Sequence, residues 1–211
     1  MSKSLKIMIS FIVVMSLCFS IAFANASTYQ IDSKQIDTQY VKGQYPVVSV
    51  DNILVKSKIN KQINKIIDEY ECKVQKDNTH GYPETGMVSY EIKANNSKVL
   101  SMIINCSTMS EKAAHPNTYT FGLTFDQEGN LVQLSQIINE TSVQGHSKDY
   151  SVDHLNKMIK AQMGDKLYPF FTDVKEFPKE FYLDDNLDLH VLFQRYDIAP
   201  YAVGLVDIIL P

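Results

Sequence analysis

The sequence lacks the short motifs by which many enzymes can be recognised. It has no Gly-x-Ser-x-Gly nucleophile elbow, no glycine-rich phosphate loop and no His-Glu-x-x-His zinc signature. The histidines are scattered and show no ligand spacing: His80, His115, His146, His154 and His190. We therefore expect a protein that is not an enzyme and that carries no cofactor and no metal.

The chain also lacks an excess of basic residues. It has 20 Lys and Arg against 24 Asp and Glu, which gives a formal charge of −4. Nucleic acid attracts basic surfaces, so we expect no nucleic-acid partner. The acidity is compatible with a cationic partner, although a need for solubility also explains it.

The one long apolar run lies at the N-terminus. Lys3 and Lys6 precede it, and small residues form Ala-x-Ala sites at 22–24 and 24–26. This layout predicts a secretory signal peptide over residues 1–26 and a mature protein that is secreted or associated with the cell envelope. Cleavage would remove two lysines and no acid, which leaves 18 basic and 24 acidic residues and a formal charge of −6. The alternative is an uncleaved membrane anchor, because residues 7–24 are near the lower length limit for a membrane span.

Cysteine is scarce, with three residues in the chain. Cys18 lies in the expected signal peptide, which leaves Cys72 and Cys106. An isolated pair in an oxidising compartment usually forms a disulfide, and two cysteines without a nearby His cluster do not make a zinc site. We therefore predict a Cys72–Cys106 disulfide, which would stabilise the fold by roughly 3–4 kcal/mol.

The rest of the chain is predicted to form strands interrupted by two helices. Apolar residues at helical spacing indicate one helix within residues 50–74 and another within 149–163, which Gly164 ends. Alternating stretches predict a hairpin turning at Asn95-Asn96, then a strand, a turn at residues 127–130 and a short second strand. Residues 180–211 read as strand, turn, strand, loop and strand. This order indicates an α+β fold, with antiparallel sheets and two main helices packed on them.

Two acidic motifs could carry chemistry, but both also suit turns. Residues 124–129, Thr-Phe-Asp-Gln-Glu-Gly, are similar to a metal motif of polysaccharide deacetylases, but Gln127 replaces its second carboxylate. Asp184, Asp185 and Asp188 could pair for acid–base work. We interpret both motifs as turns, because their residue types favour turns.

Two connections between strands are unusual because they are rich in large or rigid side chains. They are residues 111–120 and the stretch "DIAPYAVG" at residues 197–204. Tyr and Pro offer a large contact area with little entropy to lose, as binding loops do. The alternative is that Pro200 and Tyr201 only cover the end of a sheet.

Several motifs match one known family. They are His-Pro-Asn at 115–117, Phe-Asp and a Gly turn at 125–129, two leucines at 131–134, Phe-Tyr-Leu at 181–183 and the Tyr-to-Gly loop at 196–204. Together they resemble, over residues 40–211, the extracellular DUF4163/DUF3298 module of RsiV-type anti-sigma factors and PdaC-type peptidoglycan deacetylases. The resemblance implies a DUF4163-like half at 27–112 and a DUF3298-like half at 113–211, in one compact unit.

In the RsiV branch this module binds lysozyme through loops that enter the enzyme's cleft. Six residues precede the apolar run and no deacetylase domain is present, so we expect no sigma-factor partner. The expected function is a secreted, non-catalytic envelope module that binds a lysozyme-like muramidase. Two alternatives stay open: a module that binds wall glycan or a peptidoglycan fragment, and a wall-active enzyme. The resemblance implies these binding residues: His115, Pro116, Asn117, Tyr119, Pro200 and Tyr201.

Overall fold

The computed structural model describes residues 28–211, except residue 82 and residues 140–149. The expected signal peptide lies outside these residues. Within the described part, no helix is both long enough and apolar enough to cross a membrane.

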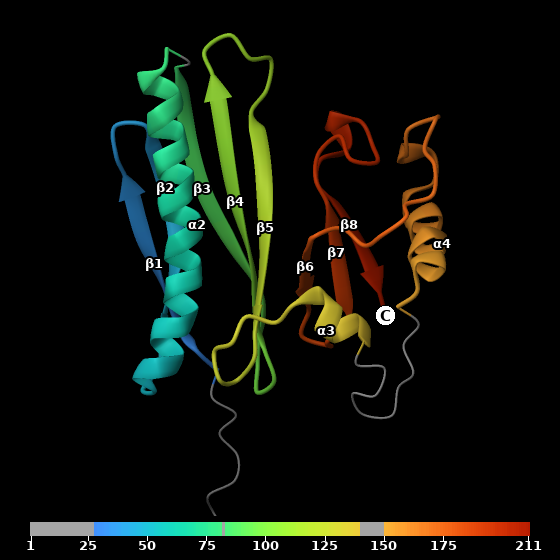
Figure 1. Cartoon of the computed structure of the whole chain (residues 1–211), viewed down its shortest axis with the longest axis horizontal. Helices are drawn as coiled ribbons and strands as arrows, with labels where there is room; N and C mark the ends of the chain where they lie inside the picture. Colours follow the sequence, from blue (N-terminus) through green and yellow to red (C-terminus); the bar gives the residue numbers. More distant parts are fainter. Residues whose placement is uncertain (1–27, 82, 140–149) are drawn as a thin grey trace, which may run out of the picture.

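The first part of the chain forms a five-stranded sheet crossed by one long helix (Figure 1). Its strands lie side by side in chain order, and neighbours are antiparallel except β2 and β3, which pair in parallel over three residue pairs. That pair is parallel because helix α2 (Ile53–Thr79) carries the chain back between them. The strands are β1 (Gln30–Asp37), β2 (Val41–Ser49), β3 (Glu84–Asn95), β4 (Leu100–Ser110) and β5 (Asn117–Phe125).

Helix α2 follows the predicted apolar pattern. Asn52 caps its N-terminus, because the Asn52 side chain accepts the backbone N–H groups of Leu54 and Val55. One face of the helix packs on the sheet and forms the main core with it. The buried residues of this face are Val55, Ile59, Ile63, Ile67, Tyr70 and Val74.

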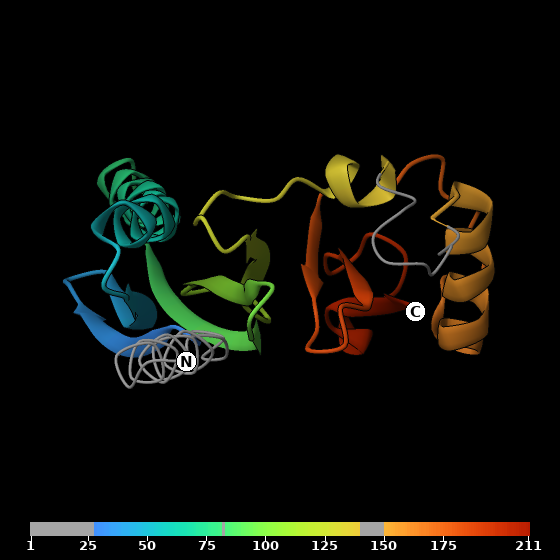
Figure 2. The ribbon, with the colours of Figure 1, turned by 90° about the horizontal axis from the view of Figure 1, so that it is seen from below.

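The second part of the chain forms a smaller, three-stranded antiparallel sheet. Its strands are β6 (Glu180–Leu183), β7 (Leu189–Phe193) and β8 (Val206–Leu210). This part of the chain also contains the helices α3 (Leu134–Asn139) and α4 (Val152–Met163). Figure 2 shows this sheet between the first sheet and α4. Every residue of β6 and β7 is buried, because one face packs on α4 and the other meets Ile103 of the first sheet.

The two sheets join where β5 meets β6. The buried carboxylate of Glu180 accepts the backbone N–H of Gly122 (2.8 Å) and the hydroxyl of Tyr119 (3.1 Å). The two backbones approach so closely that a Cβ on Gly122 would lie 2.0 Å from the Phe181 carbonyl oxygen. Nearby, the Ser101 hydroxyl accepts the N–H of Leu183 (3.0 Å). Hydrogen bonds therefore hold the edge of the first sheet to the second.

Six side-chain amides in the described part each bind the backbone of one other residue twice. In every pair the amide NH₂ donates to a carbonyl, and the amide oxygen accepts the N–H of the same residue, as a neighbouring strand would. We call these pairs amide clamps. They join Asn60 to Val48, Asn78 to Glu84, Asn95 to Tyr29, Asn156 to Val174, Gln162 to Ile209 and Gln194 to Thr120.

The predicted α+β class, with antiparallel sheets and two main helices, is confirmed. The short strand predicted after residue 130 is wrong: Leu131 makes one isolated bridge to Phe125, and the chain then enters α3. Leu134 and Ile137, three residues apart, pack on the second core. Helical spacing suits that packing and strand alternation does not.

The predicted Cys72–Cys106 disulfide is also wrong, because both thiols are free. Cys106 is buried in β4 beside Tyr70 of α2, whereas Cys72 is exposed. A helix turns by about 200° over two residues. Since Tyr70 faces the sheet, Cys72 points away from it, and the two sulfur atoms lie on opposite sides of α2.

Candidate functional site

The two unusual loops lie against each other at one end of the molecule. The β4–β5 loop (residues 111–116) leaves the first sheet, and the β7–β8 loop (residues 194–205) leaves the second (Figure 1). The rings of His115 and Tyr201 stack with centroids 3.6 Å apart and planes 18° apart. The Tyr201 hydroxyl also donates to the carbonyl of Pro116 (3.0 Å). Each sheet therefore contributes one loop to a shared contact.

A third ring, that of Tyr196, completes this contact. Its hydroxyl lies 3.0 Å from Nε2 of His115, and its ring centroid is 5.6 Å from that of Tyr201. Nδ1 of His115 lies 3.3 Å from the Pro116 carbonyl. A neutral imidazole with its proton on Nδ1 can donate to that carbonyl and accept from Tyr196. We call His115, Tyr196 and Tyr201 the ring cluster.

Tyr196 is held in a conformation that tyrosine rarely adopts. It is the third residue of the turn over residues 194–197, which the N–H of Asp197 closes on the Gln194 carbonyl (3.1 Å). Its φ of 74° lies in the left-handed region, where such a turn normally has Gly or Asn. A side chain there costs about 1–2 kcal/mol. Even so, the ring is 54% exposed, so burial in the chain's own core does not compensate for the strain.

The rest of the β7–β8 loop is firmly anchored. The Gln194 amide clamp fixes its start to Thr120 of β5, with both hydrogen bonds at 2.9 Å. Ile198 and Ala199 are buried in the second core, and Pro200 is exposed between them and Tyr201. The loop therefore both covers the end of its sheet and presents side chains to solvent.

The structure brings together four of the six predicted binding residues. His115, Pro116, Pro200 and Tyr201 lie at the contact between the loops. Asn117 and Tyr119 belong to β5 instead, and Tyr119 faces the α2 side of the sheet.

Tyr119 lies in a different environment from the ring cluster. Its ring packs on Phe121 with centroids 4.6 Å apart, and its hydroxyl donates to Glu180. Burial, followed by the nearby Glu180 carboxylate, raises the pKa of Tyr119 to about 12. The ring borders a groove of about 290 Å³ between α2 and β5. The residues along this groove include Ile66, Glu69, Tyr70, Lys73, Asn117, Tyr119 and Phe121.

The prediction missed two residues of the loop contact, Arg195 and Tyr196. The Arg195 guanidinium carbon lies 5.7 Å from the centre of the Tyr201 ring, within range of a cation–π interaction. Both residues immediately precede the stretch "DIAPYAVG". Tyr196 is a second large aromatic residue close to Tyr201 in the sequence. That proximity was the signal by which the sequence could have identified it.

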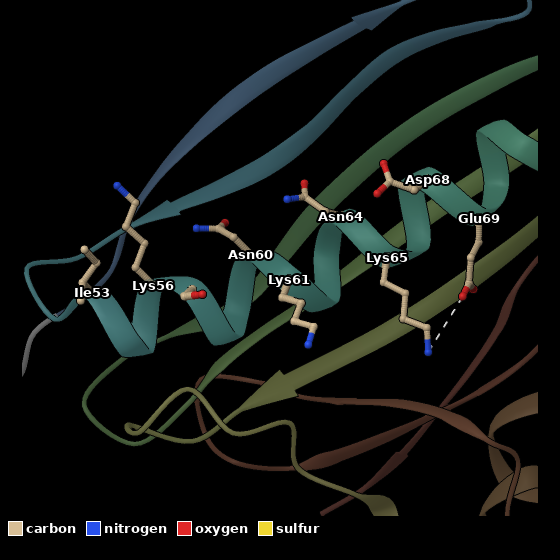
Figure 3. A pocket seen from close by; sticks show the side chains of 9 residues that line it. Ile53, Lys56, Asn60, Lys61, Asn64, Lys65, Asp68 and Glu69 are labelled. Carbon is tan, nitrogen blue, oxygen red and sulfur yellow. Dashed lines mark ion pairs between the residues drawn. The ribbon is translucent and has the colours of Figure 1, made fainter.

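The outward face of α2 is hollowed but is not a candidate site. Figure 3 shows that Lys56 points to one side of the helix, whereas Lys61 and Lys65 point to the other. Lys65 pairs with Glu69 on the same helix (3.9 Å), and Asn60 forms an amide clamp with Val48. Polar groups therefore do not converge on one point, as a ligand site would require.

The acidic motifs are turns, as predicted. Asp126 accepts the N–H groups of Glu128 and Asn130, and Asp184 accepts those of Asn186 and Asp188. Among the described residues, no group of three or more His, Cys, Asp or Glu side chains could hold a metal ion.

A buried histidine also lies in the second sheet. Nδ1 of His190 is 2.8 Å from Asp207, whose other oxygen accepts the Tyr182 hydroxyl (2.6 Å). The Tyr182 ring stacks on His190 with centroids 4.3 Å apart. Burial, followed by the hydrogen bond to Asp207, raises the pKa of Tyr182. Tyr182 also packs against Ile103 of the first sheet, which places this group of side chains at the junction of the two sheets.

Comparison with known proteins identifies a family and a fold. The model of the family described as "Protein of unknown function (DUF3298)" matches residues 51–211. A solved DUF3298 structure from Bacteroides fragilis has a TM-score of 0.62 at 18% identity, and the match covers 89% of this chain and 92% of that one. A DUF3298 protein from Pseudomonas aeruginosa has a TM-score of 0.54 at 8% identity, with 87% and 88% covered. No curated protein matches the chain. At these identities the two solved structures establish the fold alone.

Proposed function

Since the chain belongs to the DUF3298 family, we propose that it is a secreted, non-catalytic module of the cell envelope that binds a lysozyme-like muramidase. The ring cluster and the two prolines beside it form the binding surface. The resemblance to RsiV-type modules motivates the choice of ligand.

The observation that carries this proposal is the ring cluster itself. Two loops from different sheets meet through His115 and Tyr201, and Tyr196 is exposed beside them. Large, rigid rings supported from behind lose little entropy when a partner covers them, so they suit the centre of a protein interface. The left-handed strain at Tyr196 supports the same proposal, because such strain is typically retained at functional positions.

Charge is compatible with a cationic muramidase. Without residues 1–26 the chain has 18 basic and 24 acidic residues, a formal charge of −6. Opposite net charges accelerate association, and salt reduces this effect. We expect the association rate to fall as the salt concentration rises, while the dissociation rate changes little.

Replacement of Tyr196 by Gly tests the proposal. Glycine relieves the left-handed strain, which favours the folded state, but it removes the contacts of the ring and gives the unfolded chain more conformational entropy. Since these effects oppose each other, the unfolding free energy should stay within about 1 kcal/mol of wild type. Calorimetric titration of residues 27–211 with lysozyme should show binding that weakens roughly ten-fold or more in Tyr196→Gly.

The matched control is Leu187→Gly. Leu187 is the other non-glycine residue with a positive φ (65°) among the described residues, and it precedes β7 whereas Tyr196 follows it. This variant should bind lysozyme as tightly as wild type. If wild type releases no heat with lysozyme at high micromolar concentration, the proposal is wrong.

The groove beside Tyr119 favours a second candidate function, binding of wall glycan. Its side chains combine the aromatic rings of Tyr119 and Phe121 with the amide of Asn117, and sugars are bound by such mixtures of apolar and polar groups. Sedimentation of the protein with insoluble peptidoglycan tests this candidate. Loss of the sedimented fraction in Asn117→Ala, with no loss in Tyr196→Gly, would favour glycan over lysozyme.

A further inference from the structure

A third loop near the ring cluster presents a large apolar side chain to solvent. The N–H of Phe171 donates to the carbonyl of Tyr168 (2.9 Å), which places Pro169 and Phe170 at the two central positions of a turn. Phe170 is 75% exposed, and its ring stacks on that of Tyr168 with centroids 4.9 Å apart and planes 14° apart. Turn centres usually hold small or polar residues, so an exposed phenylalanine at this position needs an explanation.

This turn is bonded directly to the β7–β8 loop. The N–H of Tyr168 donates to the carbonyl of Ile198 (3.1 Å), and Ile198 lies between Tyr196 and Pro200 in the sequence. The turn follows α4, at the same end of the molecule as the β4–β5 and β7–β8 loops (Figure 1). Phe170 and the ring cluster are therefore presented from neighbouring loops.

The turn is also held rigidly. Leu167 and Phe171, on either side of it, are partly buried against the second core, and Pro169 restricts the backbone between them. The Phe170 ring has one face against Tyr168. An apolar ring held in one position by its own chain loses little entropy when a partner buries it.

We infer that the turn over residues 168–171 is a third part of the binding surface, with Phe170 as an anchor that enters an apolar pocket of a protein partner. This inference rests on the proposed function and specifies what the partner must offer. Three loops that extend from one end fit a concave surface, and a phenylalanine ring, which has no polar atom, requires an apolar pocket in it. A polar glycan chain does not supply such a pocket.

Replacement of Phe170 by Ala tests the inference, with Ile53→Ala as the matched control. Ile53 is also 75% exposed and apolar, but it begins α2 at the other end of the molecule (Figures 1 and 3). We expect Phe170→Ala to weaken lysozyme binding roughly ten-fold or more, chiefly through faster dissociation, and Ile53→Ala to leave it unchanged. Phe170→Leu, which keeps an apolar side chain, should bind with intermediate affinity. Neither alanine variant should shift the unfolding midpoint, because both side chains are exposed.

The outcomes separate this inference from the proposed function. If wild type binds lysozyme, Tyr196→Gly weakens binding and Phe170→Ala does not, then only the third loop is wrong. A Phe170→Ala variant that loses binding to peptidoglycan and keeps binding to lysozyme contradicts the protein pocket. If wild type does not bind lysozyme, both the proposed function and this inference are overturned.

Discussion

β3 of the first sheet and β6 of the second differ in how much of each strand is buried. Along β3, exposed residues recur between buried ones, so one face of the first sheet packs on α2 and much of the other meets solvent. Every residue of β6 is buried. The small sheet is covered by α4 on one face and by the first sheet on the other. The first sheet buries one face against α2, whereas the small sheet buries one face against α4 and needs the first sheet to cover the other.

This dependence matters because the ring cluster draws on both sheets. His115 comes from the first sheet, and Tyr196 and Tyr201 come from the second. Glu180 and Gln194 hold the second sheet to β5 and so set the distance between the loops. The binding surface should therefore exist only when the sheets are docked, and weakening the junction should harm both stability and binding.

The largest effect is expected from Gly122→Ala, which forces the two sheets apart. The added Cβ would lie 2.0 Å from the Phe181 carbonyl oxygen, so the backbones must separate. We expect the unfolding free energy, measured by urea denaturation, to fall by about 3 kcal/mol. Gly81→Ala is the control, because its Cβ would meet open space at a φ of +84° and should cost only about 1–2 kcal/mol. Equal losses in the two variants would contradict the dependence of the second sheet on the first.

A smaller loss of stability should follow Glu180→Ala. This change removes the carboxylate that accepts the hydrogen bonds at the junction but leaves the packing around it in place. The N–H of Gly122 and the hydroxyl of Tyr119 would lose their partner in a partly buried region. We expect the free energy of unfolding to fall by about 2 kcal/mol and lysozyme binding to weaken with it. The control is Glu176→Ala, because Glu176 is exposed. A Glu180→Ala variant as stable as wild type would show that packing alone joins the sheets.

The smallest effect concerns alkaline pH. The Tyr119 pKa of about 12 lies above the ordinary value of about 10 for an unfolded tyrosine. Tyr119 therefore favours the folded state fully below pH 10, and this contribution is lost as the pH rises through 12. Tyr119→Phe should reduce the decline in stability between pH 10 and pH 12 relative to wild type. Thermal unfolding across this range measures the difference, and identical slopes would contradict it.

The sequence predicted the long helix much better than the sheet junction. The buried face of α2 follows from apolar residues recurring at helical spacing, which is a local signal. The junction depends on contacts such as Gly122 with Phe181 and Gln194 with Thr120, which lie far apart in the chain. Local periodicity contains no information about such pairs. The disulfide was wrongly predicted for the same reason. The expected oxidising compartment favoured a bond between Cys72 and Cys106, but the direction in which Cys72 points from α2, which excludes that bond, is seen only in the structure.

The candidate site was predicted in part. The resemblance pointed to both loops, and His115 and Tyr201 do meet. It also grouped Tyr119 with them, although strand alternation places that ring on the α2 face. Tyr196 was missed because its importance depends on a left-handed φ, which residue types do not reveal when tyrosine occupies a glycine position.

The amide clamps have a consequence for how copies of this protein meet. An open sheet edge is a template on which another chain can add a strand and begin to aggregate. At β5 and β8, Gln194 and Gln162 already occupy backbone groups that an incoming strand would use. β1, the other edge of the first sheet, carries the charged residues Asp32, Lys34 and Asp37, which discourage such pairing. The edges at β1, β5 and β8 are in this way protected from pairing with a strand of another copy.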